Sequence, residues 1–234
     1  MTGFPAAAEA TWPAAARHRA GAFIVREGRG GGQRVSAATA KGPWTQADID
    51  AAERMHMSLG QTPLFMIRDG EAALDAALDA RGYRIGDRVH VRAGAVAALT
   101  AEPADPMAGF AIWPPLAIMR DLWAEGGIGP ARLAVMERVS APRTAILGRA
   151  KDRASGVAFV AVAGETAVLH ALYIVPGLRR QGSAVKIMRT AAHWAQDHGA
   201  ERFSVLVTEA NTAAGALYAS LGMEIVGQYH YRSK

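Results

Sequence analysis

The apolar positions in the C-terminal half of the chain alternate between strand and helix patterns. Residues 168–175 form an apolar strand that Pro176 and Gly177 end. A helix is predicted over 183–198, because its apolar residues recur at i, i+3, i+4 and i+7 spacing. These residues are Ala184, Ile187, Met188, Ala191, Ala192 and Ala195. Gly199 ends the helix, and a buried strand follows at 203–207. The pattern therefore predicts a strand, a glycine-bearing loop, a long helix and a second strand.

The same patterns predict the other elements. After residue 107 we expect a strand near Phe110, helices over 115–125 and 129–139, and strands over 143–148, 156–163 and 166–175. Before it we expect a β-hairpin over 22–38, a helix over 46–59, a strand over 64–67, a helix over 71–80 and a strand over 83–91. The glycine-rich stretch 28–32 of the hairpin favours a turn over a phosphate loop, since no helix in register follows it. The Pro-rich stretch 102–106 indicates a linker between domains 1–101 and 107–234.

The two halves share an order of elements. A shift of 140 residues places Ile67 on Val207, Gly82 on Gly222 and His90 on His230. This agreement predicts that the first half is a smaller, degenerate copy of the second. It has lost its chemistry, because Leu78 stands where the second half has Tyr218. We therefore predict one active site, in the C-terminal half.

The loop before the long helix suits a pyrophosphate. Its residues are Arg179, Arg180, Gln181, Gly182, Ser183 and Ala184. Such a loop presents backbone N–H groups in a concave array, and the helix adds the positive end of its dipole. Gly182 lets the backbone approach a ligand without a Cβ. The two arginines supply positive charge nearby.

A second motif follows, and the pair together resembles a known family. It runs from Asn211 to Met223 and includes Ala214, Tyr218 and Gly222. R-x-x-G-x-A followed by N-x-x-A-x-x-L-Y-x-x-x-G closely resembles the GCN5-related N-acetyltransferase (GNAT) superfamily. The resemblance implies an α/β fold with a mixed, mostly antiparallel sheet, splayed between the fourth and fifth strands of the domain. It also implies acetyl-CoA as cosubstrate.

The resemblance also implies roles for individual residues. The loop would hold the pyrophosphate, and the backbone N–H groups of Leu172, Tyr173 and Ile174 would polarise the thioester carbonyl. Tyr218 would be the general acid, because a phenol with a pKa of about 10 is protonated at neutral pH and is not far from a thiol in acidity. The alternative is a core aromatic on its helix. Asn211 would cap that helix beside the pantetheine arm, and Ala214 would leave space for it.

The general base is not evident from the sequence. No Asp or Glu occurs between Thr166 and Val175. His170 is the titratable residue on that strand with an ordinary pKa near 6.5, and it is the candidate base. A hydrogen-bonded core histidine is the other interpretation. Glu165 and Glu209 lie at neighbouring strand ends, and a water chain or a neutral amine would need no dedicated base.

Composition narrows the class of protein. Half of the residues are apolar (50%), which argues against general disorder, and there is no cysteine, which excludes disulfides and thiolate chemistry. The histidine spacing predicts no metal site. The net charge is +5, but the arginines are scattered, which argues against nucleic acid. No apolar run would span a bilayer, and charges follow the N-terminal alanines, so we expect a cytoplasmic bacterial enzyme without a signal peptide.

The predicted function is transfer of an acetyl group from acetyl-CoA to a primary amine of a small molecule or peptide. A catalytically silent acyl-CoA-binding or scaffold module is an alternative. A third is a ribosome-associated or nucleic-acid-binding protein that acetylates a protein N-terminus. The acceptor is not encoded in a recognisable pattern, and a monomer or a homodimer would fit equally.

Overall fold

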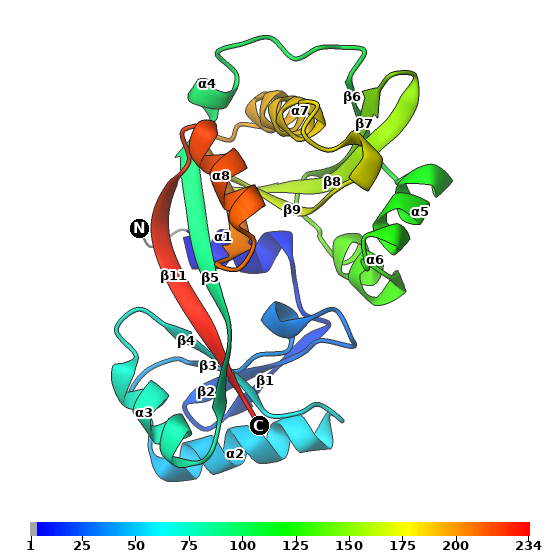
Figure 1. Ribbon diagram of the computed structural model, residues 1–234. Helices are drawn as coiled ribbons and strands as arrows, with labels where there is room; N and C mark the ends of the chain where they lie inside the picture. The colour runs from blue at the N-terminus through cyan, green and yellow to red at the C-terminus, as the bar shows by residue number, and fades with distance from the viewer. Residues whose placement is uncertain (1–3) are drawn as a thin grey trace. The chain divides into compact units, whose positions relative to one another are not determined.

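The computed structural model describes residues 4–234, and their strands form one eight-stranded and one three-stranded sheet (Figure 1). The larger sheet has the order β4-β11-β5-β10-β9-β8-β7-β6. Its strands are β4 (Leu64–Arg68), β5 (Arg84–Ala95), β6 (Gly109–Ile112), β7 (Arg143–Ala150), β8 (Arg153–Ala163), β9 (Thr166–Ile174), β10 (Arg202–Thr208) and β11 (Glu224–Ser233). Neighbours β4–β11, β6–β7, β7–β8 and β8–β9 are antiparallel, whereas β9–β10 is parallel. The mixed, mostly antiparallel sheet is therefore confirmed.

The core of the C-terminal half lies under the predicted long helix, α7 (Ser183–Asp197). Five of the six residues of its apolar face are buried: Ile187, Met188, Ala191, Ala192 and Ala195. They share a core with alternate residues of β8, among them Ala158 and Val160. Burying one large aliphatic side chain contributes about 1.5–3 kcal/mol, so this face fixes the helix on the sheet. The other helices of this half are α4 (Val96–Leu99), α5 (Ala117–Glu125), α6 (Pro130–Glu137) and α8 (Thr212–Ser220).

Strands β9 and β10 separate before they end. Their paired residues run from Thr166 with Arg202 to Leu169 with Val205. Beyond that point β9 continues to Ile174 and β10 to Thr208. The two strands are the fourth and fifth of the C-terminal half, so the sheet diverges where the splay was expected.

Strand β9 also contains a bulge. Phe159 of β8 pairs with His170, whereas Val157 pairs with Tyr173. Ala158 alone therefore stands opposite two residues, Ala171 and Leu172. Ala171 has a φ of +53°, which is uncommon for a residue with a Cβ. The bulge lies at the level where β10 has left β9.

The N-terminal half contains α1 (Phe4–Thr11), β1 (Ala16–Ala20), β2 (Phe23–Glu27), β3 (Thr39–Ala40), α2 (Gln46–Ser58) and α3 (Ala72–Ala80), besides β4 and β5. The predicted hairpin over 22–38 is wrong in its second arm. Gln33–Val35 form a 3₁₀ turn, because Val35 is buried and the Ser36 hydroxyl donates to the Gly32 carbonyl oxygen at 3.0 Å. Strand β2 pairs with β1 on one side and with Thr39 and Ala40 on the other.

The element bounds reproduce the internal repeat. A shift of 140 residues carries α3 (Ala72–Ala80) onto α8 (Thr212–Ser220) and the start of β5 onto the start of β11. The repeated strands are exchanged: β5 of the first half lies next to β10, and β11 of the second half lies next to β4. Leu78, which aligns with Tyr218, is fully buried in an apolar core. An apolar contact therefore stands where the second half has the tyrosine, and the degenerate character of the first half remains a prediction.

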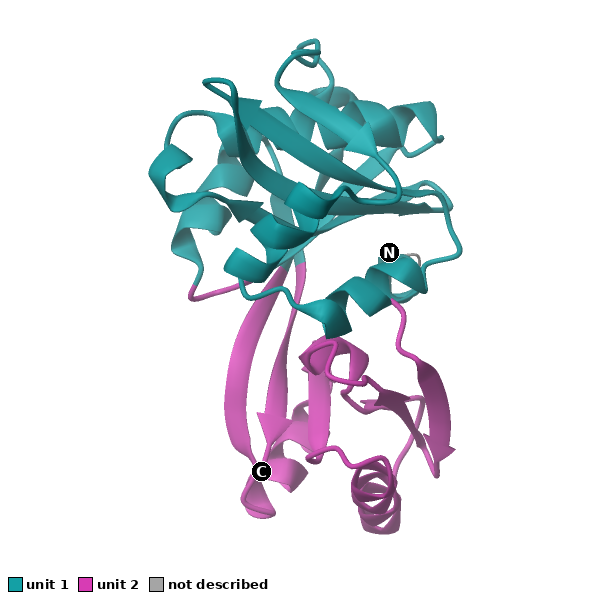
Figure 2. Cartoon of the chain, turned by 90° about the vertical axis from the view of Figure 1, so that its right-hand side faces the viewer, with its two compact units in different colours: residues 1–12, 91–207, 211–226 teal, residues 13–90, 208–210, 227–234 magenta. Residues whose placement is uncertain are grey.

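Two compact units divide the chain (Figure 2). Unit 1 comprises the residues up to Trp12, 91–207 and 211–226, and unit 2 comprises 13–90, 208–210 and 227–234. The linker predicted at 102–106 divides the sequence between its two repeated halves, whereas the two compact units are defined by contacts in space. That boundary remains a prediction.

Candidate active site

The loop after β9 is held in a conformation that requires glycine at its last position. Pro176–Leu178 form a 3₁₀ turn, Arg180 has a φ of +60°, and Gly182 has a φ of +81° at the N-cap of α7. A Cβ built on Gly182 would meet nothing within 4 Å. Glycine is needed here for its left-handed backbone, while the space beside it stays open.

Side chains of the loop brace its own carbonyl groups. Arg179 Nε donates to the Ile174 carbonyl oxygen at 3.1 Å, and Gln181 Nε2 donates to that of Gly177 at 3.2 Å. The Ser183 hydroxyl, which is buried, reaches the Leu178 carbonyl oxygen at 3.5 Å. No side chain caps α7 at Gly182. The first-turn N–H groups, which include those of Ser183 and Ala184, therefore keep the donor capacity that helix geometry leaves unused.

The bulge in β9 is fixed from α5. The indole Nε1 of the fully buried Trp123 donates to the Ala171 carbonyl oxygen at 2.9 Å. Gly126, which follows α5, lies so close to the ring of Tyr173 that an added Cβ would stand 2.6 Å from Cδ2. Both contacts determine where the backbone of the following residues points.

Strand register orients the three predicted backbone donors differently. The N–H of Val175 donates to the Ser155 carbonyl oxygen at 3.0 Å, on the β8 side. N–H directions alternate along a strand, so the Tyr173 N–H also faces β8 and the Ile174 N–H faces the opposite edge. That edge opens where β10 has diverged. The Ile174 N–H therefore points into the gap between β9 and β10, and Leu172 lies within the bulge.

Tyr218 lies on α8, whose N-cap is Asn211 as predicted. Asn211 Oδ1 accepts the Ala214 N–H at 3.1 Å. Tyr218 is 6% exposed and belongs to the core under α7, with Ala214 and Leu217 packed against that core. Burial raises the pKa of Tyr218 to about 12. The phenol is therefore protonated at neutral pH, as a general acid must be.

His170 is buried against α1, a helix that the sequence did not predict. The Thr11 hydroxyl donates to the Ala7 carbonyl oxygen at 2.8 Å, so its oxygen accepts from His170 Nε2 at 3.0 Å. Nε2 is therefore the protonated nitrogen. The ring lies 4.9 Å from that of Trp12 and 6.2 Å from that of Phe159, measured between centroids. The alanines of α1 favour a helix, and Pro5 in its first turn is compatible with one.

The remaining carboxylate candidates lie at strand ends. Glu165 is exposed after β8, and its carbonyl oxygen accepts the N–H groups of Glu201 and Arg202. Glu209 follows β10, and its N–H donates to the Arg88 carbonyl oxygen at 2.8 Å. In the described residues 4–234, no three His, Asp or Glu side chains are grouped to hold a metal ion. No helix in that same range has the length and apolar character needed to cross a membrane.

Comparison with known proteins finds acetyltransferases. Residues 121–223 match the model of the acetyltransferase (GNAT) family. The uncharacterized N-acetyltransferase YobR of Bacillus subtilis is 25% identical over 241 residues, which cover 97% of this chain and 96% of that protein. The aminoglycoside N(6')-acetyltransferase type 1 of Klebsiella aerogenes is 27% identical over 126 residues, 48% of this chain and 83% of that protein. A GCN5-related N-acetyltransferase from Kribbella flavida has the same fold, with a TM-score of 0.71, 17% identity, and coverage of 97% of this chain and 92% of that one.

Proposed function

We propose that this chain, an N-acetyltransferase of the GNAT superfamily, moves an acetyl group directly from acetyl-CoA to a primary amine. The observation that supports acetyl-CoA as the cosubstrate is the uncapped N-terminus of α7. It is preceded by Gly182, which has a left-handed backbone, and is flanked by Arg179 and Arg180. These N–H groups and the helix dipole suit a pyrophosphate. The gap between β9 and β10 suits the pantetheine arm, with Asn211 and Ala214 beside it.

The proposed reaction has one bond-forming and one bond-breaking event. The neutral amine nitrogen attacks the thioester carbon, and the Ile174 N–H, with Leu172 and Tyr173 around it, stabilises the oxyanion. One such donor is typically worth ~10²–10³ in rate. The C–S bond then breaks, and the CoA thiolate takes a proton from Tyr218. Solvent reprotonates the phenolate.

His170 is the proposed acceptor of the proton that the amine loses. Because Nε2 already donates to Thr11, the incoming proton would have to be taken at Nδ1. This requirement makes the role directly testable, since a base and a buried hydrogen-bonded ring respond differently to pH. An amine that arrives neutral would bypass the residue.

A small-molecule acceptor is favoured by one relative. The similar Klebsiella protein is named as an aminoglycoside acetyltransferase, which modifies an amino group of a small molecule. For this chain we propose only the class of acceptor, which is a small molecule or a peptide with a primary amine. A silent acyl-CoA-binding module remains the second candidate function, because β9 carries no carboxylate and its histidine is bonded to Thr11.

Calorimetric titration with acetyl-CoA tests the proposal. We expect saturable one-to-one binding that an Arg179→Glu/Gly182→Glu double variant abolishes. Gly164→Glu is the matched control, because Gly164 also has a positive φ (+57°) and open space but lies at the other end of β9. Absence of binding to the wild-type chain would exclude the acetyl-CoA proposal. Two sites per chain would mean that the first half is not degenerate.

A silent module is distinguished by turnover. Thiol release in the presence of a panel of small amines and short peptides is expected for the enzyme. Tight binding of acetyl-CoA without release of CoA thiol with any amine would favour the binding module.

A further inference from the structure

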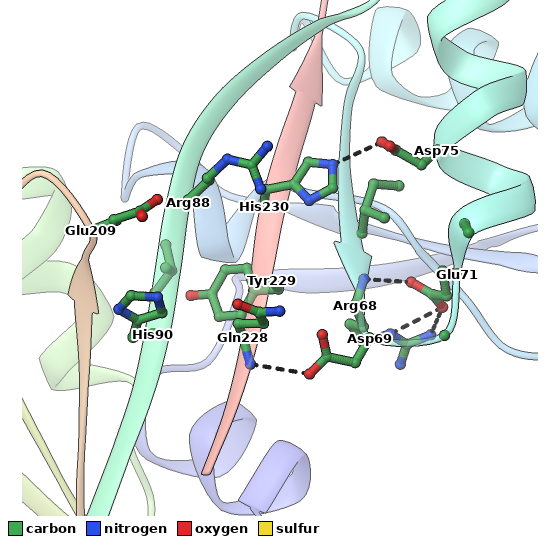
Figure 3. A pocket seen from close by; sticks show the side chains of 14 residues that line it. Arg68, Asp69, Glu71, Asp75, Arg88, His90, Glu209, Gln228, Tyr229 and His230 are labelled. Atoms are coloured by element: carbon green, nitrogen blue, oxygen red, sulfur yellow. Dashed lines mark hydrogen bonds and ion pairs between the residues drawn. The ribbon is translucent and has the colours of Figure 1, made fainter. Parts of the chain in front are cut away.

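Unit 2 carries a groove of its own, with a volume of about 390 Å³. It lies over β5 and β11 and is bounded by the loop after β4, the start of α3 and the end of β10 (Figure 3). All of its lining residues belong to unit 2. Its volume is within the range of small-molecule sites.

The internal repeat explains what lines the groove. The shift of 140 residues pairs Asp69 with Glu209, Arg88 with Gln228 and His90 with His230, and all six line it. Exchange of β5 and β11 brings these repeated positions together on neighbouring strands. The groove is therefore lined by the same positions of both copies, with different side chains in each.

Several of its charged side chains already have partners. Glu71 accepts the Arg68 N–H at 2.8 Å and its Nε at 3.1 Å. Asp75 accepts His230 Nε2 and Arg232 Nε, both at 2.7 Å. These pairs hold α3 against β4 and β11. They leave little capacity for a ligand.

Two opposite charges in the groove remain unused. Arg88 and Glu209 are both exposed, and their backbones are joined by the hydrogen bond from Glu209 to Arg88. Even so, within the described part of the chain neither side chain forms a hydrogen bond or an ion pair. Asp69 accepts the Gln228 N–H through Oδ2 at 3.3 Å. Its Oδ1 has no hydrogen-bond partner among residues 4–234. The groove therefore offers a ligand the unpaired guanidinium of Arg88 and unpaired carboxylate oxygens of Glu209 and Asp69.

We propose that this groove binds a small zwitterion, an amine that also carries a carboxylate. The ammonium group of the ligand binds the carboxylate of Glu209, and the carboxylate of the ligand binds the planar guanidinium of Arg88. A ligand of this kind brings a partner of opposite charge for each of the two unpaired charges of the groove. The proposal goes beyond acetyl transfer and does not depend on it, because binding is measured without acetyl-CoA.

The probe is 6-aminohexanoate, titrated into the full chain labelled with ¹⁵N. Hexylamine lacks its carboxylate and hexanoate lacks its ammonium group, so each analogue removes one charge at the same chain length. We expect 6-aminohexanoate to bind about tenfold or more tightly than either analogue. The amide signals of Gly70, Glu209 and Gln228 should shift with the same saturation curve.

Two variants test which residue of the groove binds each charged group of the ligand. Arg88→Gln should abolish the preference over hexylamine, and Glu209→Gln should abolish the preference over hexanoate. Arg84→Gln and Glu224→Gln are controls on β5 and β11, because both residues are exposed and neither lines the groove. Equal affinity for the three probes, shifts confined to other amides, or Arg88 and Glu209 variants that behave as the controls do would each overturn the proposal.

Discussion

The indole N–H of Trp123 donates to the carbonyl oxygen of Ala171 at 2.9 Å, at the residue of β9 whose φ is positive. A carbonyl group in a bulge has lost its ladder partner, and an unsatisfied buried one costs about 1–3 kcal/mol. Trp123 thus stabilises the bulge from which the predicted backbone donors continue. A side chain of α5 thereby acts on the geometry of β9.

Trp123→Phe should separate this role from simple packing. The variant keeps an aromatic ring but removes the donor. We expect kcat to fall roughly ten- to hundredfold, because small displacements of catalytic donors are costly. Affinity for acetyl-CoA should change little. Trp194→Phe on α7 is the matched control, and an equal loss of kcat there would contradict the role of the hydrogen bond.

Gly126→Ala tests the position of Tyr173 by steric means. The added methyl group would stand 2.6 Å from the Tyr173 ring, whereas at Gly129 it would meet nothing within 4 Å. Neither glycine has a positive φ, so backbone strain does not enter. Overpacking costs about 1–3 kcal/mol. We therefore expect lower thermal stability and lower kcat for Gly126→Ala. Gly129→Ala, at the N-cap of α6, should keep the wild-type kcat with a smaller loss of stability. Identical behaviour of the two variants would remove the proposed contact.

Tyr218→Phe tests the proposed acid. Because burial raises the pKa of Tyr218 to about 12, the phenol stays protonated through the pH range of ordinary assays. We expect a ~10²–10⁴ loss of kcat in the variant, with affinity for acetyl-CoA little changed. In the wild type, activity should not fall between pH 8 and 10 through this residue. A fully active phenylalanine variant would leave Tyr218 as a core aromatic.

His170→Gln tests the proposed base. We expect a loss of ~10²–10⁴ in kcat/KM and the disappearance of the acid limb of its pH profile. Thr11→Val removes the hydroxyl that accepts from Nε2 and donates to Ala7, and it serves as the comparison. It should lower stability while the acid limb of the pH profile is kept. If His170→Gln is less stable but retains its activity and its acid limb, the ring is a structural residue.

Asp75→Asn tests the ion-pair cluster on α3. Hydrogen bonds from Arg232 and His230 lower the pKa of Asp75 from 3.8 to about 2. The ionised carboxylate therefore stabilises the folded state fully above pH 4, and this contribution is lost as the pH falls towards 2. With solvent screening we expect the variant to lose about 1–2 kcal/mol of unfolding free energy at pH 7 and much less near pH 2.

Chemical denaturation at both pH values measures the difference. Asp79→Asn is the control, because Asp79 also binds Arg232 but is 68% exposed, and it should cost less at pH 7. A loss for Asp75→Asn that is the same at both pH values would assign the effect to packing.

Local periodicity predicted elements well where one face of an element is apolar. Helix α7 begins at Ser183, as its spacing indicated, and ends at Asp197, one residue earlier than expected. The repeat was visible for a similar reason, since α3 and α8 have the same length and the same place between strands. Asn211 was recognisable as a cap because its side chain satisfies its own helix.

Features that depend on distant partners were not predictable from the sequence. Ala171 adopts a positive φ through its place opposite Ala158 and its bond to Trp123, and nothing about an alanine indicates this. The contact of His170 with Thr11 joins residues 159 positions apart. Periodicity identifies a strand but not its neighbour, so the exchange of β5 and β11 was not expected either.

The exchange of β5 and β11 determines the order in which parts of the molecule can fold during synthesis. Asp69 and Gln228, which bond across β4 and β11, are 159 residues apart. A chain emerging from the ribosome therefore exposes the apolar residues of β4 until β11 has been synthesised, although α2 and α3 can form early. Such a non-local topology slows folding and prolongs exposure to aggregation. We expect ribosome-bound chains that end before β11 to be protease-sensitive in unit 2 and to be strong clients for chaperones.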